Sequence, residues 1–281
     1  MRLLSSILLF LCVVFMGSCE VINPEEPVPT FLHIDSFSFR PTSTYVGTRS
    51  QKITSVWVYF NGNNIGAFDL PATVPILAEK SGQLRVVPGV TYSGINDVLT
   101  AYPFFVSDTM TLVPAEGQIV SWTPETGYLN DSLLNVLNIN FETGLNPFLK
   151  FSGDTGLTIV DNPELVFEGK YSGYIYLDND SSSEIISTTG FAASKESYIE
   201  LNYKGTLPFE IGLATTSGTF IPQYLFGYKP RSDWNKVYIG LQDFIGAHPD
   251  QVYKIIVKVQ PGGSATGYVA FDNLKVVTRK P

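Results

Sequence analysis

Short runs of β-branched and aromatic residues, separated by clusters of Gly, Pro, Asn and Asp, dominate the chain from residue 31 onward. No long stretch repeats its apolar positions every 3.6 residues, as an amphipathic helix would. In residues 53–60, valines alternate with Trp57 and Tyr59, which is the two-residue period of a strand. Residues 61–64 (Asn-Gly-Asn-Asn) tolerate positive φ and predict a hairpin. The pattern therefore predicts an all-β protein.

Two blocks of such strands flank a break at residues 124–137, where Pro124, Gly127 and Asn130 interrupt regular structure. The first block, residues 31–123, has the length of a seven-stranded sandwich. The second, residues 138–281, is long enough for eight or nine strands in two sheets. Further strands of the first block are expected at residues 31–39, 65–68, 84–90, 102–106, 109–113 and 118–122.

The first block resembles small prealbumin-like or PEGA-like sandwiches of the immunoglobulin-like kind. The resemblance rests on a strand, the Asn-Gly turn, and Leu-Pro-Ala-Thr-Val-Pro at residues 70–75. It covers about 60 residues and implies a spacer or contact module.

The second block resembles the jelly-roll fold of carbohydrate-binding modules. It opens on Phe-Glu at residues 141–142, carries Gly-Lys-Tyr-Ser-Gly at residues 169–173, and closes on Phe-Asp-Asn-Leu at residues 271–274. This resemblance implies a two-sheet jelly roll that binds glycan or another cell-surface component. A jelly roll that serves only as a spacer is the alternative, because a fold does not specify a ligand.

The N-terminus resembles a bacterial lipoprotein signal. An apolar stretch after Arg2 is too short to span a bilayer, and small residues precede Cys19, so residues 1–18 are expected to be removed and Cys19 lipidated. Residues 19–30 form a Pro-rich, acidic tether, which resembles surface lipoproteins of Bacteroidetes. We expect an outer-membrane lipoprotein that faces the cell surface or the periplasm. An ordinary secretory signal with an incidental cysteine is the alternative.

Composition narrows the possible functions. The chain of 281 residues has 18 Lys+Arg against 26 Asp+Glu, a net charge of −8, which argues against binding to nucleic-acid phosphates. Only two His and two Cys are present, and no nucleophile-elbow, zinc-protease or phosphate-loop motif occurs. We therefore predict a protein that is not an enzyme, although a carboxylate pair assembled by the fold could still hydrolyse a glycan.

Three residues are candidates for a structural calcium site. In similar jelly rolls the first and last strands are neighbours, so the resemblance implies Glu142, Asp272 and the carbonyl of Lys170 as ligands. Calcium takes six to eight oxygen ligands, so further carbonyls or waters would be needed. The alternative is that both carboxylates are solvated or hydrogen-bonded at strand ends.

Aromatic residues are dense in the second block, and aromatic rings can pack on the C–H face of a sugar. Residues 220–228 are expected to be a loop with exposed aromatics, among them Tyr224 and Tyr228. Trp234 belongs to a predicted strand on which it shares a face with Lys236, opposite the more apolar face. Tyr224, Tyr228 and Trp234 are the candidate ligand-binding residues; the alternative is that these rings fill the cores of the sandwiches.

Taken together, the sequence predicts a non-catalytic, membrane-anchored lipoprotein whose jelly roll binds glycan or another surface component. An adhesion or structural lipoprotein that binds a protein partner is the first alternative, and a glycan-active hydrolase is the second. A groove with aligned aromatics and polar neighbours would favour the glycan, whereas a flat or fully packed face would favour a protein partner or a spacer.

Overall fold

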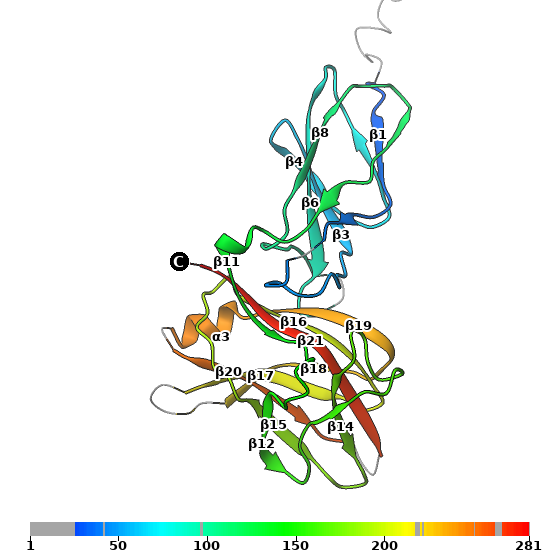
Figure 1. Cartoon of the computed structure of the whole chain (residues 1–281). Helices are drawn as coiled ribbons and strands as arrows, with labels where there is room; N and C mark the ends of the chain where they lie inside the picture. The colour runs from blue at the N-terminus through cyan, green and yellow to red at the C-terminus, as the bar shows by residue number, and fades with distance from the viewer. Residues whose placement is uncertain are drawn as a thin grey trace, which may run out of the picture.

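The computed structural model describes residues 26–41, 43–95, 98–216, 220, 222–249, 251–261 and 266–280. These residues form two β-sandwich units stacked end to end, with the N-terminal unit above the C-terminal unit in Figure 1. The prediction of an all-β fold is confirmed. The described chain enters at the end of the N-terminal unit that lies farthest from the C-terminal unit.

The N-terminal unit packs a three-stranded sheet, ordered β5-β1-β9, against a sheet ordered β4-β3-β6-β7 in which β8 also pairs with β6. A small pair, β10-β2, extends it. Valine, leucine and isoleucine side chains from β1, β3, β5, β6 and β8 form its core. The strands are β1 (Thr30–Ile34), β2 (Ser38–Phe39), β3 (Ser55–Phe60), β4 (Asn63–Asp69), β5 (Ala72–Ile76), β6 (Gly82–Thr91), β7 (Leu99–Ala101), β8 (Asp108–Leu112), β9 (Ile119–Ser121) and β10 (Glu125–Thr126).

The hairpin predicted at residues 61–64 joins β3 to β4. Asn61 and Gly62 both have positive φ, at 49° and 82°, as a two-residue hairpin turn with the right-handed twist of its strands requires. Val56 and Val58 are buried, whereas Trp57 and Tyr59 are half-buried, so the alternation predicted along β3 is confirmed.

The C-terminal unit is a jelly-roll β-sandwich of two sheets. We call β13-β14-β21-β16-β19, with β11 paired to β21, the docked sheet, and β12-β15-β20-β17-β18 the open sheet. Its elements are η1 (Asp131–Leu133), β11 (Leu134–Ile139), β12 (Phe148–Gly153), β13 (Thr158–Val160), β14 (Ser172–Leu177), β15 (Ser183–Ser187), β16 (Tyr198–Gly205), β17 (Phe209–Thr215), β18 (Pro222–Tyr228), β19 (Arg231–Gly240), α3 (Gln242–Ala247), β20 (Tyr253–Val259) and β21 (Gly267–Arg279).

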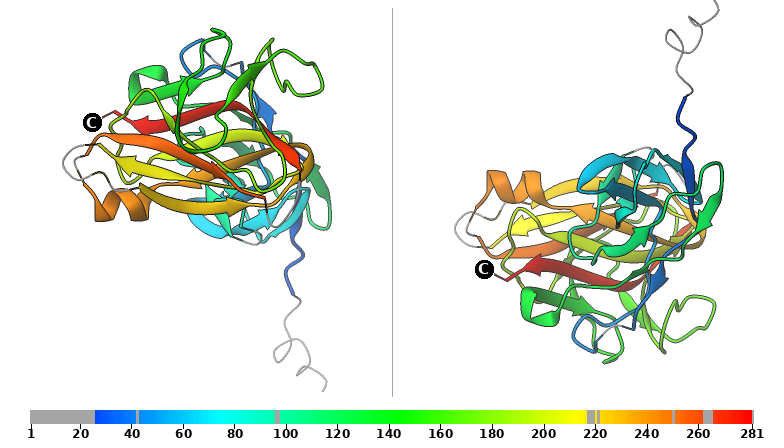
Figure 2. Two further views of the ribbon diagram at one scale, coloured as in Figure 1. Left: turned by 90° about the horizontal axis from the view of Figure 1, so that it is seen from below. Right: turned by 90° about the horizontal axis from the view of Figure 1, so that it is seen from above.

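The two sheets of this unit enclose one apolar core, and the docked sheet lies nearer the N-terminal unit (Figures 1 and 2). The long strand β21 crosses the docked sheet and pairs with three strands, β11, β14 and β16. Its register against β16 shifts beside Asn273, which has a φ of 47°. This bulge lets Phe271 and Leu274 both enter the core although they are three residues apart.

Two of the predicted strands differ in the structure. Residues 31–39 are divided into β1 and β2 by residues 35–37. Residues 102–106 are not a strand, and only Phe105 makes an isolated bridge, to Tyr128. Pro103 has no N–H to donate, and Tyr102, Phe104 and Phe105 are all buried, which the alternation of a strand would not allow.

Two further segments also differ from expectation. The segment predicted as an aromatic loop at residues 220–228 is largely β18, an edge strand of the open sheet. The break at residues 124–137 is shared between the units, since β10 pairs with β2 of the first and β11 with β21 of the second.

Candidate functional site

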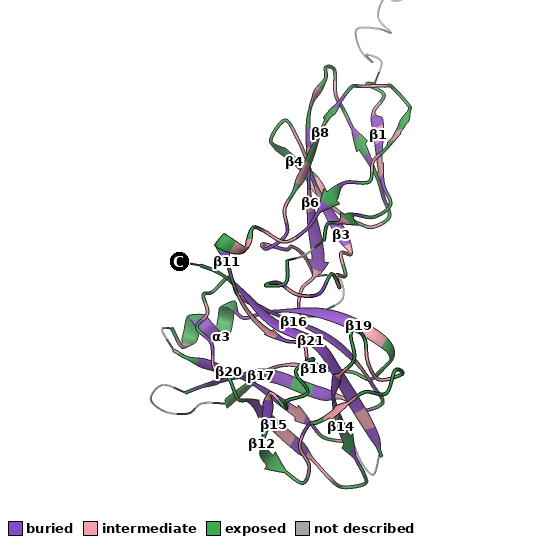
Figure 3. Ribbon diagram, viewed as in Figure 1, coloured by how far each residue is buried: buried purple, intermediate pink, exposed green. Residues whose placement is uncertain are grey.

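The outer face of the docked sheet is covered by the N-terminal unit over β16 and parts of β19 and β21. Tyr198 and Tyr238 of this face are buried against Tyr102, with ring centroids 5.2 and 4.8 Å from that of Tyr102. These separations are typical of favourable edge-on or tilted aromatic pairs. Figure 3 shows β16 and β21 as predominantly buried strands, and the second half of β19 is buried as well. This face is therefore an interface within the chain.

A buried ion cluster lies at the centre of this interface. The carboxylate of Glu200 (β16) is 2.8 Å from the ammonium of Lys236 (β19) and 3.6 Å from that of Lys275 (β21). Tyr102 and Tyr128 of the N-terminal unit donate hydrogen bonds of 2.7–2.8 Å to the same carboxylate. One carboxylate thus links β16, β19 and β21 of the docked sheet to the other unit.

The electrostatics of the cluster follow from its burial. Burial alone would raise the pKa of Glu200, but Lys236 and Lys275 outweigh it and lower the pKa to about 2. Burial lowers the pKa of Lys275 to about 8, against the opposing attraction of Glu200. Glu200 is thus a permanent anion at neutral pH, shared between two cations.

Backbone contacts reinforce the interface. The amide of Ser93, just after β6, donates to the carbonyl of Tyr238 at 2.7 Å, and the hydroxyl of Tyr228 donates to the carbonyl of Ser93 at 2.9 Å. Gly240 makes room for the contact, because a Cβ there would lie 2.4 Å from the Tyr92 ring. The close fit holds the N-terminal unit against β19.

The outer face of the open sheet has a different character. A row of paired positions across this face carries Leu149, Ile186, Ile256, Gly212 and Tyr224. The next row pairs Glu184, Lys258 and Glu210 on β15, β20 and β17. An apolar row therefore lies beside a row of alternating charge.

The Tyr224 side chain lies across this face. Its hydroxyl donates a hydrogen bond to Glu184, although β17 and β20 lie between β18 and β15. The tyrosine and glutamate side chains together bridge these three strand spacings, which amount to roughly 14 Å. Burial and the neighbouring Glu184 carboxylate raise the pKa of the Tyr224 hydroxyl. The ammonium of Lys258 lies 5.9 Å from the Tyr224 ring.

Two phenylalanines of this unit contact each other and stay exposed. Phe220, from the connection between β17 and β18, contacts Phe151 of β12 with ring centroids 5.3 Å apart. The two residues come from opposite edges of the open sheet. They are 40% and 45% exposed, so their rings remain available for contact. Phe151, Phe220 and Tyr224, with Glu184, Lys258 and Glu210, form what we call the aromatic face.

A cavity of about 440 Å³ adjoins the aromatic face. Its lining includes Glu210, Lys229, Lys258, Gln260 and Tyr228, which is one of the residues predicted to bind a ligand; Pro208, Phe209, Gly227 and Pro261 complete it. Its volume is within the range typical of small-ligand sites. A carboxylate and two ammonium groups provide both acceptors and donors there.

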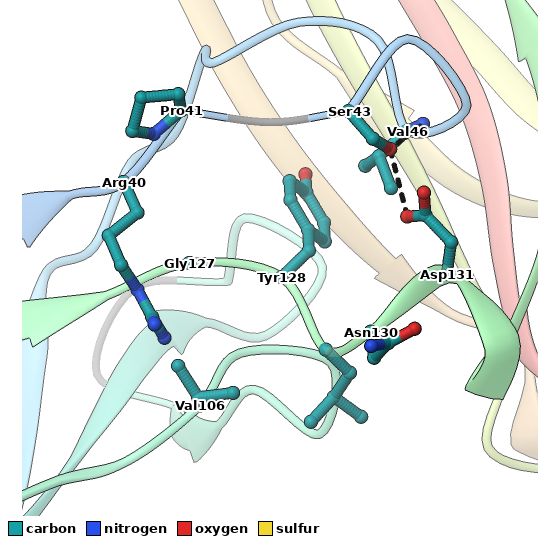
Figure 4. A pocket seen from close by; sticks show the side chains of 10 residues that line it. Arg40, Pro41, Ser43, Val46, Val106, Gly127, Tyr128, Asn130 and Asp131 are labelled. Carbon is teal, nitrogen blue, oxygen red and sulfur yellow. Dashed lines mark hydrogen bonds between the residues drawn. The ribbon is translucent and has the colours of Figure 1, made fainter.

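A second hollow, of about 390 Å³, lies where the N-terminal unit meets the connection to the C-terminal unit (Figure 4). Ser43 donates a hydrogen bond of 2.8 Å to Asp131 across it. Tyr128 faces into it, but its hydroxyl is bound to Glu200. Its lining side chains thus maintain the junction.

The structure separates the three residues predicted to bind a ligand. Tyr224 belongs to the aromatic face. Tyr228 packs into the core, stacked on Phe209 at 5.2 Å, and both residues also line the cavity of about 440 Å³. Trp234 is half-buried near the start of β19 and packs edge-on against Phe167, 5.6 Å away. The prediction of an exposed aromatic loop is corrected by strand pairing, which turns alternate side chains of β18 inward.

The residues predicted to bind calcium do lie beside one loop. Glu142 accepts hydrogen bonds of 3.0–3.1 Å from the amides of Lys170 and Tyr171. Asp272 accepts bonds of 3.0 and 3.1 Å from the amides of Phe167 and Glu168. Burial and the charge of Glu142 raise the pKa of Asp272 to about 6, against the opposing effect of these amide donors.

The described side chains at this loop do not by themselves form a metal-binding cluster. Within the described ranges, no three His, Cys, Asp or Glu side chains are grouped so as to hold a metal ion. Both carboxylates already accept N–H donors from the loop. Calcium binding through Glu142, Lys170 and Asp272 stays a prediction.

The sequence reasoning did not identify Glu200, Lys236 and Lys275 as functional. A signal was present, because each charged residue stands directly beside a core residue in its strand. Phe151 was also missed, since a single aromatic in a short strand carries no distinguishing pattern.

The predicted signal peptide and Cys19 lie outside the described residues. In the part of the chain that is described, no helix is long and apolar enough to cross a membrane.

Comparisons with known proteins give the following results. No family model matches the chain, and no curated protein matches it. Among solved structures, the chain is similar to TmCBM61 in complex with β-1,4-galactotriose, at 18% identity over 50% of this chain and 94% of that one, with a TM-score of 0.36. A family 29 carbohydrate-binding module matches at 12% identity over 52% and 89%, with a TM-score of 0.36.

A third solved structure covers more of the chain. It is described as showing the promiscuous specificity of carbohydrate-binding modules from the β-sandwich superfamily, and it matches at 16% identity over 81% of this chain and 85% of that one, with a TM-score of 0.37. These similarities concern the β-sandwich fold, and at such identities they do not transfer a ligand.

Proposed function

We propose that this protein is a non-catalytic glycan-binding lipoprotein whose aromatic face holds the sugar. The observation that carries the proposal is the outer face of the open sheet, where Phe151, Phe220 and Tyr224 lie beside a row of charged residues. Aromatic rings pack against the C–H faces of pyranoses, and carboxylates and ammonium groups bond to sugar hydroxyls. Exposed rings beside a polar row, together with the adjoining cavity, support a glycan in preference to a protein partner.

The position of the aromatic face fits this role. The N-terminal unit covers the docked sheet, so the open sheet is the face of the jelly roll that is directed away from the start of the chain (Figure 1). A lipid on Cys19 would tether the opposite end of the molecule. The N-terminal unit then acts as a spacer between the membrane and the ligand.

A glycan array with the chain from residue 20 to 281 tests the binding proposal. Phe151→Ala and Phe220→Ala change exposed rings and should weaken binding by more than about tenfold, or roughly 1.4 kcal/mol. The matched control is Tyr176→Ala, since Tyr176 is an aromatic residue on the docked sheet and is 50% exposed. Binding that survives both phenylalanine changes and is lost in the control would overturn the assignment.

The hydrolase alternative is tested in the same samples. Glu184 and Glu210 both oppose Lys258 on the aromatic face, so they are the carboxylates to examine. Glu184 already accepts hydrogen bonds from Tyr224 and Ser152, which supports a structural role. We expect no release of reducing sugar from any glycan that binds; release abolished by Glu210→Gln would make the protein an enzyme.

The membrane anchor has its own test. We expect Cys19→Ser to move the protein from the membrane fraction to the soluble fraction, because lipid chains supply the binding energy. Cys12→Ser is the matched control, since Cys12 lies within the predicted signal peptide. A Cys19→Ser protein that stays in the membrane fraction would contradict lipidation at this residue.

A further inference from the structure

A small enclosed cavity of about 80 Å³ lies between the two units, away from the aromatic face. Lys52, Thr54 and Thr91 of the N-terminal unit line one side. Arg231, Asn235 and Lys236 of β19 line the other, together with tyrosines that belong to the interface. The cavity therefore joins the two units through polar and basic side chains.

All the charged residues that line this cavity are basic. Lys52, Arg231 and Lys236 are its charged residues, and no carboxylate is among the described residues that line it. Glu200 pairs with Lys236 and is shared with Lys275, on which the charge of Glu168 also acts. The ammonium of Lys52 has a neutral partner, the side-chain oxygen of Asn235 at 2.6 Å.

The positive charges of Lys52 and Arg231 repel each other. Burial lowers the pKa of Lys52, and the charge of Arg231 lowers it further. Neither Lys52 nor Arg231 has a salt bridge among the described residues, and an anion between them would offset their mutual repulsion. Arginine is suited to this, because its guanidinium group can donate two parallel hydrogen bonds to an oxyanion.

We propose that this cavity binds a small oxyanion group, a carboxylate, sulfate or phosphate, between Lys52, Arg231 and Lys236. The hydroxyls of Thr54 and Thr91 hydrogen-bond to each other at 3.2 Å, which leaves one of their two hydrogens to donate to the oxyanion. One water needs about 10–15 Å³ of such space, so the cavity accommodates an oxyanion but is too small to enclose a sugar ring. Lys52 and Arg231 are exposed to solvent and form the entrance.

An oxyanion at this position would bind both units at once. It would therefore stabilise their docking, because a ligand that binds only the docked state shifts the equilibrium toward it. The site is separate from the aromatic face, so the proposal does not depend on glycan binding.

Thermal unfolding and calorimetry of the chain from residue 20 to 281 test the proposal. Sodium sulfate, phosphate and acetate are titrated at constant ionic strength against chloride, which separates binding from general salt effects. We expect a saturable rise in melting temperature with at least one oxyanion. A parallel titration with glucuronate against glucose distinguishes an anionic sugar from a free inorganic ion.

The variants assign the effect to the cavity. Lys52→Gln combined with Arg231→Gln should weaken oxyanion binding at least tenfold while leaving the melting temperature in chloride unchanged or higher. Lys80→Gln, at an exposed lysine between β5 and β6, is the control and should bind as the wild type does. Absence of a saturable response to every anion, or an equal response in the double variant, would overturn the proposal.

Discussion

The two outer faces of the jelly roll contain similar residue types but serve different purposes. On the docked sheet, tyrosines and charged residues are buried against the N-terminal unit, and Glu200 accepts hydrogen bonds from both Tyr102 and Tyr128 of that unit. On the open sheet, Phe151 and Phe220 stay partly exposed, and Glu184, Lys258 and Glu210 form a charged row. Aromatic and charged residues on a strand thus do not mark a binding site until the topology shows which face is covered.

The largest expected effect is the loss of the ion cluster on the docked sheet. Glu200→Ala leaves Lys236 and Lys275 buried without their shared anion, which should reduce the free energy of unfolding by about 3–5 kcal/mol. Urea denaturation followed by tyrosine fluorescence measures this. Glu196→Ala, at an exposed salt bridge to Arg279, is the control and should change stability by less than about 0.5 kcal/mol. Equal effects of the two substitutions would contradict the importance of the cluster.

The pH dependence of stability should report the same cluster. The pKa of Glu200 falls from 4.5 to about 2 on folding, so its contribution is present above pH 4.5 and is lost as the pH falls toward 2. The difference corresponds to roughly 3 kcal/mol. Wild-type stability should therefore fall more steeply between pH 4.5 and 2 than that of Glu200→Gln. Parallel curves for the two proteins would show that Glu200 titrates normally.

A pair of glycine substitutions compares the packing of the two faces. Gly240→Ala on β19 places a Cβ within 2.4–2.7 Å of the Tyr92 ring and should cost about 1–3 kcal/mol. Gly227→Ala on β18 places its Cβ no closer than 3.9 Å to the Glu210 side chain. It should be nearly neutral for stability. If Gly227→Ala proved as costly as Gly240→Ala in chemical denaturation, the open face would be as tightly packed as the docked one.

The smallest expected effect is a change in melting temperature on adding calcium. It concerns the loop beside Glu142 and Asp272, which belongs to neither of the two compared faces. A calcium site would raise the melting temperature saturably at millimolar Ca²⁺, and Asp272→Asn would abolish the rise. An unchanged melting temperature in Ca²⁺ and in EDTA would mean that the amide donors of Lys170 and Phe167 hold the loop without a metal.

Local pattern predicted much of the fold. The alternation along β3 and the Asn-Gly turn determine a hairpin within ten residues, so the sequence was sufficient there. It was insufficient at Tyr102 and Phe105, whose burial depends on the other unit and not on local strand pairing.

The same limit applies to the candidate site. The alternation on β19 correctly placed Val237 and Ile239 in the core and Trp234 and Lys236 on the other side. The strand pattern could not show whether the side of β19 that carries Lys236 faces solvent, because that depends on the N-terminal unit, which covers Lys236. Likewise, Phe151 and Phe220 come together only because the open sheet brings β12 and the β17–β18 connection to one face.

Hydroxyl-radical footprinting of the chain from residue 20 to 281, alone and with the glycan mixture used for the array, tests the central claim most directly. The account predicts that Phe151 and Phe220 are labelled in the free protein and protected when glycan binds, whereas Tyr198 and Tyr238 stay unlabelled throughout. Labelling of Tyr198 and Tyr238 in the free protein, or glycan protection confined to Tyr176, would contradict it.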